Sequence, residues 1–223
     1  MREQLESMAE EKYRLFAASL LPPKTKMLGI RLPKLRSLAK QMAKQQRFDW
    51  QAPQDAFMEE KMLEGMIIGY ADLSFEERCR RVKRFVPKID NWSVCDSVCV
   101  SLRSWVKQDK AAVWKLLEPF LQSDKAYQLR FAVVMMLDFF VDDEYLPQVL
   151  ARLDAVKHND YYVKMAVAWA VSVCFAKYPA ETMQYLLSCS LDDDTFNKAL
   201  QKIVESYRVA PELKLKIKAM KRK

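Results

Sequence analysis

Residues 127–133 read Tyr-Gln-Leu-Arg-Phe-Ala-Val, and residues 161–167 read Tyr-Tyr-Val-Lys-Met-Ala-Val, so similar residue types return 34 positions later. Around both segments, apolar residues recur at the period of an α-helix, and the interval leaves room for a second helix. A helical hairpin repeated at roughly 20–50 residues is typical of a solenoid. The two segments therefore predict an all-α fold made of repeated helical hairpins.

Two classes of helical repeat have periods near this one. The Trp, Gly and Tyr positions that mark tetratricopeptide repeats are not recognisable here, and HEAT-like hairpins fit better, although their usual period is slightly longer. We therefore expect a right-handed α-α superhelix of HEAT-like antiparallel hairpins that forms a single domain over residues 1–223. The chain has only three glycines, which argues against a sandwich, a barrel or a glycine-rich phosphate loop.

Prolines and capping residues mark the expected helix boundaries. One amphipathic helix is expected over residues 1–21, where Pro22 and Pro23 stop it. Pro33 and Pro53 are each expected to lie near the start of a helix. Further helix starts are predicted from residues that cap N-termini, namely Ser74, Asp90 or Asn91, Asp109, Asp124, and Asp142 or Asp143. A long apolar helix is expected over residues 161–178, where Pro179 ends it.

The 34-residue offset also relates four polar positions, each in an otherwise apolar helix: Asp96, Arg130, Lys164 and Lys198. Equivalent positions of stacked hairpins line up along one face, so these side chains are expected to form a row on the concave side. A lone charge on a helix more often points into solvent, and this alternative stays open. The repetition among apolar neighbours favours the row.

The segment Ile89–Cys99 is expected to begin a helix on which Trp92 and Asp96 share one face. A carboxylate beside an indole attracts a cation through Coulomb attraction and through the quadrupole of the ring. The alternative is a buried Trp with an acid near a helix N-terminus, stabilised by the helix dipole. An acid within a basic row would suit a locally positive group, such as a cationic modified base or an oxocarbenium-like sugar.

The net charge of +8 and the pI near 9.2 favour a polyanionic partner, although such a charge can also serve solubility alone. Between Leu20 and Phe48 the chain carries basic residues and no acid. This run is either a solvated face or an edge that contacts phosphates. On the second interpretation Arg31, Lys34 and Arg36 are expected to bind DNA.

Composition also limits the chemistry. Cys95 and Cys99 could hold half of a metal site, but the chain has no second pair of cysteines to match them and only one histidine. No zinc site, metal or cofactor is therefore expected, and a catalytic triad is disfavoured. Reduced thiols in a cytoplasmic protein are the better interpretation. No apolar run is long enough to span a membrane, and the N-terminus is too acidic for a signal peptide.

Four local motifs carry a resemblance that runs from about Leu28 to the C-terminus. They are Leu-Gly-Ile-Arg-Leu-Pro at 28–33 with Leu-Arg at 35–36, Trp-Ser-Val-Cys-Asp-Ser-Val at 92–98, Gln-Leu-Arg-Phe-Ala at 128–132, and Lys-Met-Ala-Val-Ala-Trp at 164–169. The chain resembles the AlkD-type DNA glycosylases, HEAT-like repeat proteins of DNA alkylation repair that excise positively charged alkylpurines.

The resemblance implies hydrolysis of the N-glycosidic bond of N3- or N7-alkylated purines in double-stranded DNA by a monomer. Asp96 would be the catalytic carboxylate, and Trp92 and Trp169 would be the aromatic walls. Arg130 would anchor a phosphate near the lesion. Lys164 and Lys198 would hold further phosphates of the DNA.

One departure from the family pattern concerns the N-terminus. Active members carry two helices before the Leu-Gly-Ile turn, whereas here Pro22–Lys26 is expected to join a single helix directly to it. The chain thus looks like a shortened paralogue branch whose excision is slow or absent. Two alternatives remain: a non-catalytic nucleic-acid-binding paralogue, and a helical-repeat scaffold that holds an acidic peptide.

Overall fold

A computed structural model describes residues 1–49 and 55–222. In these two ranges every regular element is a helix and no strand occurs, which confirms the expected all-α fold. The chain divides into two compact units, residues 1–116 and 117–223. Each unit is described separately below, and a single domain over the whole chain stays a prediction.

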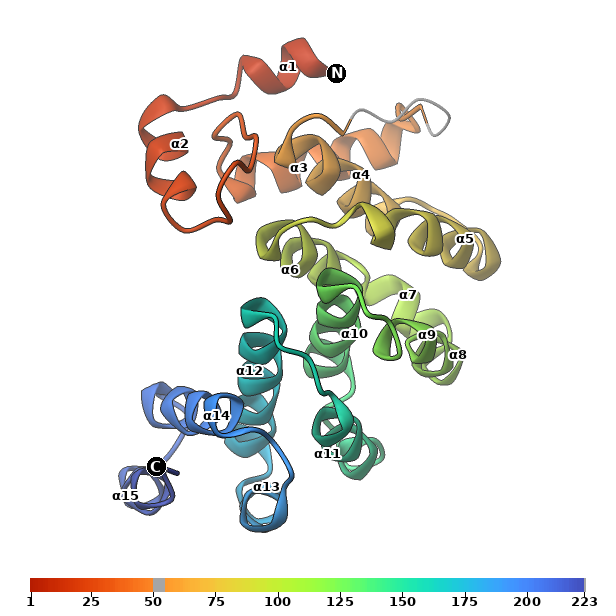
Figure 1. The fold of residues 1–223 in the computed structure, drawn as a ribbon. Helices are drawn as coiled ribbons and strands as arrows, with labels where there is room; N and C mark the ends of the chain where they lie inside the picture. Colours follow the sequence, from red (N-terminus) through yellow and green to blue (C-terminus); the bar gives the residue numbers. More distant parts are fainter. Residues whose placement is uncertain (50–54, 223) are drawn as a thin grey trace. The chain divides into compact units, whose positions relative to one another are not determined.

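The first unit has a central helix, α4, which contacts α3 and α6 on its flanks (Figure 1). The helices α5 and α7 also contact α4. In chain order the elements of this unit are α1 (Arg2–Glu6), α2 (Glu11–Ala18), α3 (Leu32–Gln45), α4 (Met58–Tyr70), α5 (Phe75–Phe85), the 3-10 helix η1 (Val86–Lys88), α6 (Trp92–Ser101), α7 (Arg103–Gln108) and α8 (Lys110–Leu116).

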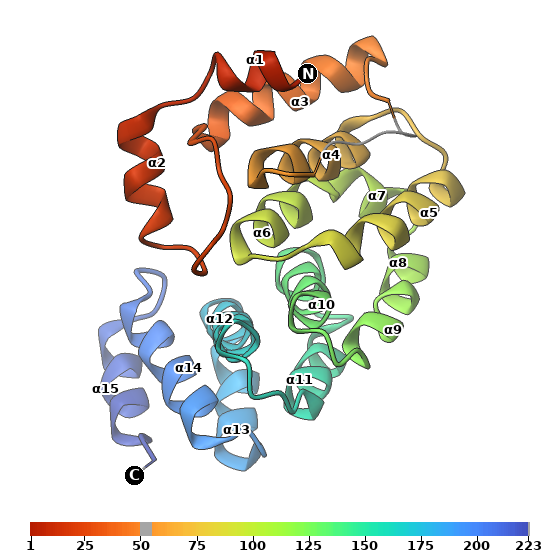
Figure 2. The ribbon, with the colours of Figure 1, turned by 45° about the horizontal axis from the view of Figure 1, so that its top comes forward.

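In the second unit α12 packs between α10 and α14, and it also contacts α11 and α13 (Figure 2). Alternate helices thus form a row, as expected for stacked hairpins. In chain order the helices are α9 (Glu118–Leu121), α10 (Ala126–Phe139), α11 (Leu146–Ala155), α12 (Tyr161–Lys177), α13 (Pro179–Ser188), α14 (Asp193–Glu205) and α15 (Pro211–Ala219).

The helix predicted over residues 1–21 is wrong, because α1 and α2 are two separate short helices. Glu10 adopts an extended backbone, and its N–H donates to the Gly29 carbonyl at 3.0 Å instead of continuing the helix. The same Glu10 accepts from Arg31 and Lys34 through its carboxylate. Two helices therefore precede the Leu-Gly-Ile turn, and the expected single helix is corrected. The helix start expected at Pro53 lies outside the described residues.

The Leu-Gly-Ile turn is held by the carboxylate of Glu59, which is fully buried at the start of α4. Its oxygens accept the backbone N–H groups of Leu28, Gly29 and Ile30 at 2.9, 2.7 and 3.2 Å. Gly29 has φ +89°, and a Cβ there would lie 2.5 Å from the Cβ of Arg14. This turn is thus a buried structural joint between the N-terminal helices, α3 and α4.

Two glycines bring α4 close to α6, the helix that carries Trp92 and Asp96. A Cβ on Gly65 would lie 2.3 Å from Cγ2 of Val98, and one on Gly69 would lie 2.5 Å from the carbonyl oxygen of Ser101. Real side chains essentially never approach so closely. The absence of side chains at these positions therefore sets the spacing of the two helices.

Replacing Gly69 by Ala is expected to lower the free energy of unfolding by about 1–3 kcal/mol, because the backbone of Ser101 must move to admit the methyl group. Helix propensity alone predicts the opposite sign, a gain of about 0.5–1 kcal/mol. Urea denaturation followed by circular dichroism measures the difference. An unchanged or raised stability would show that α4 and α6 are not packed this closely.

Candidate functional site

The start of α6 is fixed by a chain of hydrogen bonds. The fully buried Asn91 accepts the N–H of Val94 with its side-chain oxygen at 3.0 Å, which confirms it as the N-cap. Its amide donates to Asp90 at 3.0 Å, and the other oxygen of Asp90 accepts from Nζ of Lys61 at 2.6 Å. The N-terminus of α6 is thereby tied to α4.

Trp92 and Asp96 lie one turn apart on α6, and both are half-buried. The indole Nε1–H of Trp92 donates to the Leu20 carbonyl at 3.0 Å, just beyond the end of α2. On the opposite side of the helix Val94 and Val98 are buried in the core. The packing and the indole hydrogen bond fix the helix, and Asp96 lies half-buried on the face that carries Trp92.

The predicted basic edge of the first unit is partly neutralised within the protein. Nε of Arg31 and Nζ of Lys34 both bind the carboxylate of Glu10, at 2.9 and 2.8 Å. The hydrogen bonds from Lys34 and Arg31 lower the pKa of Glu10, so this acid stays ionised. Arg36 is half-buried and lies near Tyr70. The burial of Tyr70 raises the pKa of its hydroxyl, and the positive charge of Arg36 opposes this shift.

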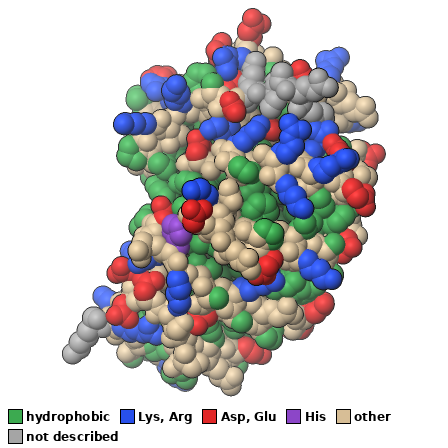
Figure 3. All heavy atoms as spheres, turned by 45° about the vertical axis from the view of Figure 1, so that its right-hand side comes forward, with side chains coloured by type: hydrophobic (Ala, Val, Ile, Leu, Met, Phe, Trp, Pro, Cys, Tyr) green, Lys and Arg blue, Asp and Glu red, His purple; other side chains and the backbone are tan. Residues whose placement is uncertain are grey.

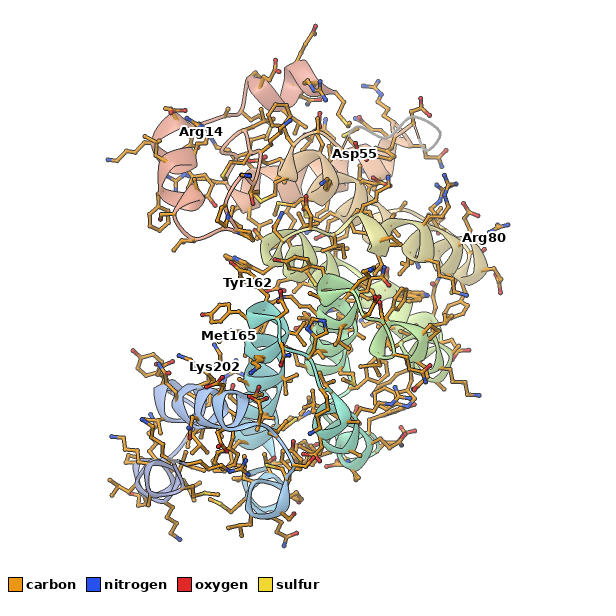
Figure 4. All side chains as sticks on the ribbon, viewed as in Figure 1. Arg14, Asp55, Arg80, Tyr162, Met165 and Lys202 are labelled. Carbon is orange, nitrogen blue, oxygen red and sulfur yellow. The ribbon has the colours of Figure 1, made fainter. Side chains whose placement is uncertain are left out.

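The face in Figure 3 shows basic and acidic side chains intermixed rather than a surface of one sign. On α5, for example, Arg80 and Arg81 both pair with Glu77. Figure 4 shows Arg80 projecting from α5 into solvent, so this charged edge of α5 is solvated. Residues 1–116 contain 22 Lys and Arg against 15 Asp and Glu, so this unit still carries most of the excess positive charge, although several of its basic side chains pair with acids.

Arg130 on α10 is buried, with an exposed fraction of 6%. Its Nη1 donates to the carbonyl of Tyr162 at 2.6 Å and so joins α10 to the first turn of α12. The ring of Tyr162 lies 5.9 Å from that of Tyr127 across the same pair of helices. Arg130 thus has a positioning role within the unit, and its contact with a DNA phosphate stays a prediction.

Lys164 on α12 binds two carboxylates at the start of α14. Its Nζ lies 2.9 Å from Asp192 and 3.3 Å from Asp194. The hydrogen bond that Lys164 donates to Asp192 raises the pKa of Lys164. Burial acts to raise the pKa of Asp192, but hydrogen bonds from Thr195 and Lys164 outweigh it and lower this pKa to about 2.

Acidification is expected to weaken this pair. Because the pKa of Asp192 is lower in the folded chain than in the unfolded one, its contribution to stability is present above about pH 4 and is lost as the pH falls toward 2. Asp192→Asn should flatten that part of the curve of stability against pH, whereas Asp193→Asn, which does not contact Lys164, should not. Thermal melting at a series of pH values measures both, and equal curves for the two variants would contradict the assignment.

Lys164 and Lys198 line the same groove of about 740 Å³ between α12, α14 and α15, here called the α12–α14–α15 groove. Met165 on α12 also lines it. Figure 4 labels Met165, and it also labels Lys202 on α14, which is not a lining residue. The other lining residues are Asn159, Tyr161, Asp194, Asn197, Leu200, Gln201, Val204, Glu205, Lys218 and Lys221.

The two lysines predicted from the offset are thus brought together, but most of the groove was missed. Lys218 lies near the end of α15 and Lys221 lies just after it, and this basic run was visible in the sequence without any sign of the helix that it packs against. Trp169 is half-buried on α12 and is not among the lining residues. Its predicted role as an aromatic wall stays untested.

Two further observations concern the classes of site considered from composition. Over residues 1–49 and 55–222, no group of three or more His, Cys, Asp and Glu side chains is arranged to hold a metal ion. Within the same ranges no helix has both the length and the apolar character needed to cross a membrane.

Comparison with known proteins identifies the family. The family model described as DNA alkylation repair enzyme matches residues 1–208, which is most of the chain. No match was found among the curated proteins or among the solved structures. The chain therefore belongs to the DNA alkylation repair enzyme family.

Proposed function

We propose that this protein hydrolyses the N-glycosidic bond of N3- or N7-alkylated purines in double-stranded DNA. Membership of the family supports a role in DNA repair. The observation that carries the reaction is the half-buried carboxylate of Asp96, one turn after the anchored Trp92 on α6. This pair offers negative charge and an aromatic ring to a positive centre.

The chemistry requires no general acid. When the bond from C1′ to the purine nitrogen breaks, its electron pair neutralises the positive charge of the alkylated base, which leaves as a neutral molecule. The sugar is left with oxocarbenium character, which Asp96 stabilises by Coulomb attraction. Water then adds to C1′ and loses its proton to Asp96 or to solvent. Trp92 supplies an aromatic surface for the same charge.

The proposal assigns the DNA backbone to basic side chains. In the first unit these are Arg31, Lys34 and Arg36, and in the second unit Arg130, Lys164 and Lys198. Those already bound to Glu10, Asp192 and Asp194 would exchange a carboxylate for a phosphate. Trp169 is proposed as a further aromatic surface. Binding should therefore weaken steeply as salt concentration rises.

The α2 helix adds a contact of another kind. Leu15 and Phe16 on it, and Leu20 just after it, are 61%, 62% and 53% exposed. Large apolar side chains of this kind insert between base steps from the minor groove in many DNA-binding proteins. The expected loss of activity depended on a missing N-terminal helix, and because α1 and α2 are both present, that argument no longer applies.

A single-turnover assay with excess protein tests the proposal. Duplex DNA containing N7-methylguanine is incubated with the protein, and the free base is measured by liquid chromatography and mass spectrometry. We expect release well above the spontaneous rate, and none from unmodified duplex of the same sequence. Release at the spontaneous rate would contradict the proposal.

A non-catalytic DNA-binding protein is the second candidate. It is favoured because some of the predicted site residues already bind other groups of the protein. The Trp92 indole donates to the Leu20 carbonyl, and Lys164 is bound to two aspartates. For this candidate the same duplex would be retained in a salt-dependent manner, without release of the base. An acidic peptide that competes fully with the duplex would instead favour a protein scaffold.

A further inference from the structure

We propose that the α12–α14–α15 groove binds an unpaired nucleotide of a nucleic-acid strand. The base would stack on Tyr161 over an apolar wall, and the phosphates on either side would lie among Lys198, Lys218 and Lys221. This inference goes beyond base excision and does not require it, although Lys198 is shared with the DNA-backbone contacts proposed above. The family match ends at residue 208, so α15 and its two lysines lie outside the matched part of the chain.

The charge of the groove favours an anion. Four lysines line it against two carboxylates, Asp194 and Glu205. Asp194 is occupied by Lys164 at 3.3 Å, and Glu205 accepts from the amide of Gln201 at 2.8 Å. Within the described part of the chain, Lys198, Lys218 and Lys221 form no ion pair. These three ammonium groups can therefore receive phosphates at no cost in broken salt bridges.

The rest of the lining is suited to a base rather than to a second charge. The side chains of Leu200, Val204 and Met165 form an apolar wall. The ring of Tyr161 is 59% exposed and is supported edge-on by Tyr162, with centroids 5.3 Å apart and an interplanar angle of 81°. An exposed, supported aromatic ring beside lysines is the arrangement on which single-stranded nucleic acids stack.

The groove is held open by an anchor at the end of α15. The guanidinium of Arg222 lies 3.8 Å from the centroid of the Phe196 ring and donates to the Leu191 carbonyl at 2.6 Å. The backbone N–H and C=O of Arg222 both bond the side chain of Asn197, at 3.0 Å each. These bonds hold the backbone beside Lys218 and Lys221 against α14 before any ligand arrives, which lowers the entropic cost of binding.

The size and the chemistry favour a nucleotide over an acidic peptide. A volume of about 740 Å³ lies in the usual range of small-ligand sites, roughly 300–1,000 Å³. The carboxylates of an acidic peptide would find the lysines but would leave Tyr161 and the apolar wall without a partner. A nucleotide uses both parts of the groove.

Fluorescence anisotropy with the full chain and a labelled oligothymidylate tests the proposal. Tyr161→Ala is expected to weaken binding roughly five- to a hundredfold through the loss of one stacking contact. Lys218→Ala combined with Lys221→Ala should weaken it too, and should make the plot of log K against log salt shallower by about 1.4 for two lost phosphates. The matched control is Lys214→Ala with Lys216→Ala, which removes the same charge from α15 outside the groove and should have a small effect.

Three results would overturn the proposal: unchanged affinity in the groove variants, equal losses in the groove and control pairs, or equally tight binding of an oligoglutamate peptide. Circular dichroism verifies that each variant is folded. Lys214, Lys216 and Lys218 lie on α15, and Lys221 follows two residues after its end. Because the strand is unmethylated and no base is released, a failure of excision leaves this result unaffected. Excision that persists in variants without strand binding would separate the two sites.

Discussion

Replacing Asp96 by Asn is expected to slow the release of N7-methylguanine from duplex DNA about a hundred- to a thousandfold. The amide keeps the shape of the side chain but removes the negative charge that faces the developing sugar cation. Loss of one preorganised electrostatic group typically raises the barrier by about 2.7–4 kcal/mol. The effect should appear in the rate of the single-turnover step rather than in the affinity for DNA.

A matched control lies at the same end of the same helix. Asp90→Asn also removes a carboxylate near the N-terminus of α6, but the group is exposed and paired with Lys61. It should slow excision far less than Asp96→Asn, because the amide still offers an oxygen to the Asn91 side chain and the lost pair with Lys61 is exposed. Equal rates for Asp96→Asn and the wild type would remove Asp96 from the mechanism, and equal losses in both variants would indicate a general effect of charge on α6.

Replacing Glu59 by Ala is expected to lower the free energy of unfolding by about 3 kcal/mol or more. The change leaves the N–H groups of Leu28, Gly29 and Ile30 without their acceptor in a buried turn. Each buried donor left unpaired costs about 1–3 kcal/mol, and relaxation of the turn recovers part of the sum. Urea denaturation followed by circular dichroism gives the difference.

The size of the Glu59 effect depends on the acceptors, so two further variants separate the causes. Glu59→Gln keeps one carbonyl oxygen and should lose less stability than the alanine variant. Glu76→Ala, an exposed acid in the first turn of α5, should change the stability by less than about 0.5 kcal/mol. If Glu59→Ala proved as stable as Glu76→Ala, the turn would not depend on this carboxylate.

Local signals predicted several helix starts correctly. Ser74 caps α5 by accepting the N–H of Glu77, and Asn91 caps α6 by accepting that of Val94. Asp109 accepts the N–H of Ala112 at the start of α8. These bonds join residues three apart, so the sequence contains both partners in one short window. The helix expected from Asp109 to Leu121 is nevertheless divided into α8 and α9.

Contacts between distant residues could not be predicted. The carbonyl that receives the Trp92 indole belongs to Leu20, and the acids that bind Lys164 come from the start of the next-but-one helix. The periodicity shows that Lys164 and Lys198 recur, but not that a carboxylate will meet the first and leave the second exposed. Arg130 was expected in a row on the concave face, and its burial and its bond to the Tyr162 carbonyl could not be predicted.

Two of the three glycines lie in α4, and the third, Gly29, takes a positive φ in the turn before α3. Lys24 and Gln46 also take a positive φ although they are not glycines, and Gln46 occupies the position after α3 where glycine is common. Each such residue is strained by about 1–2 kcal/mol. In return, the unfolded ensemble of a glycine-poor chain has fewer backbone states to lose on folding. Part of the stability of this protein thus originates in the restricted entropy of its denatured state.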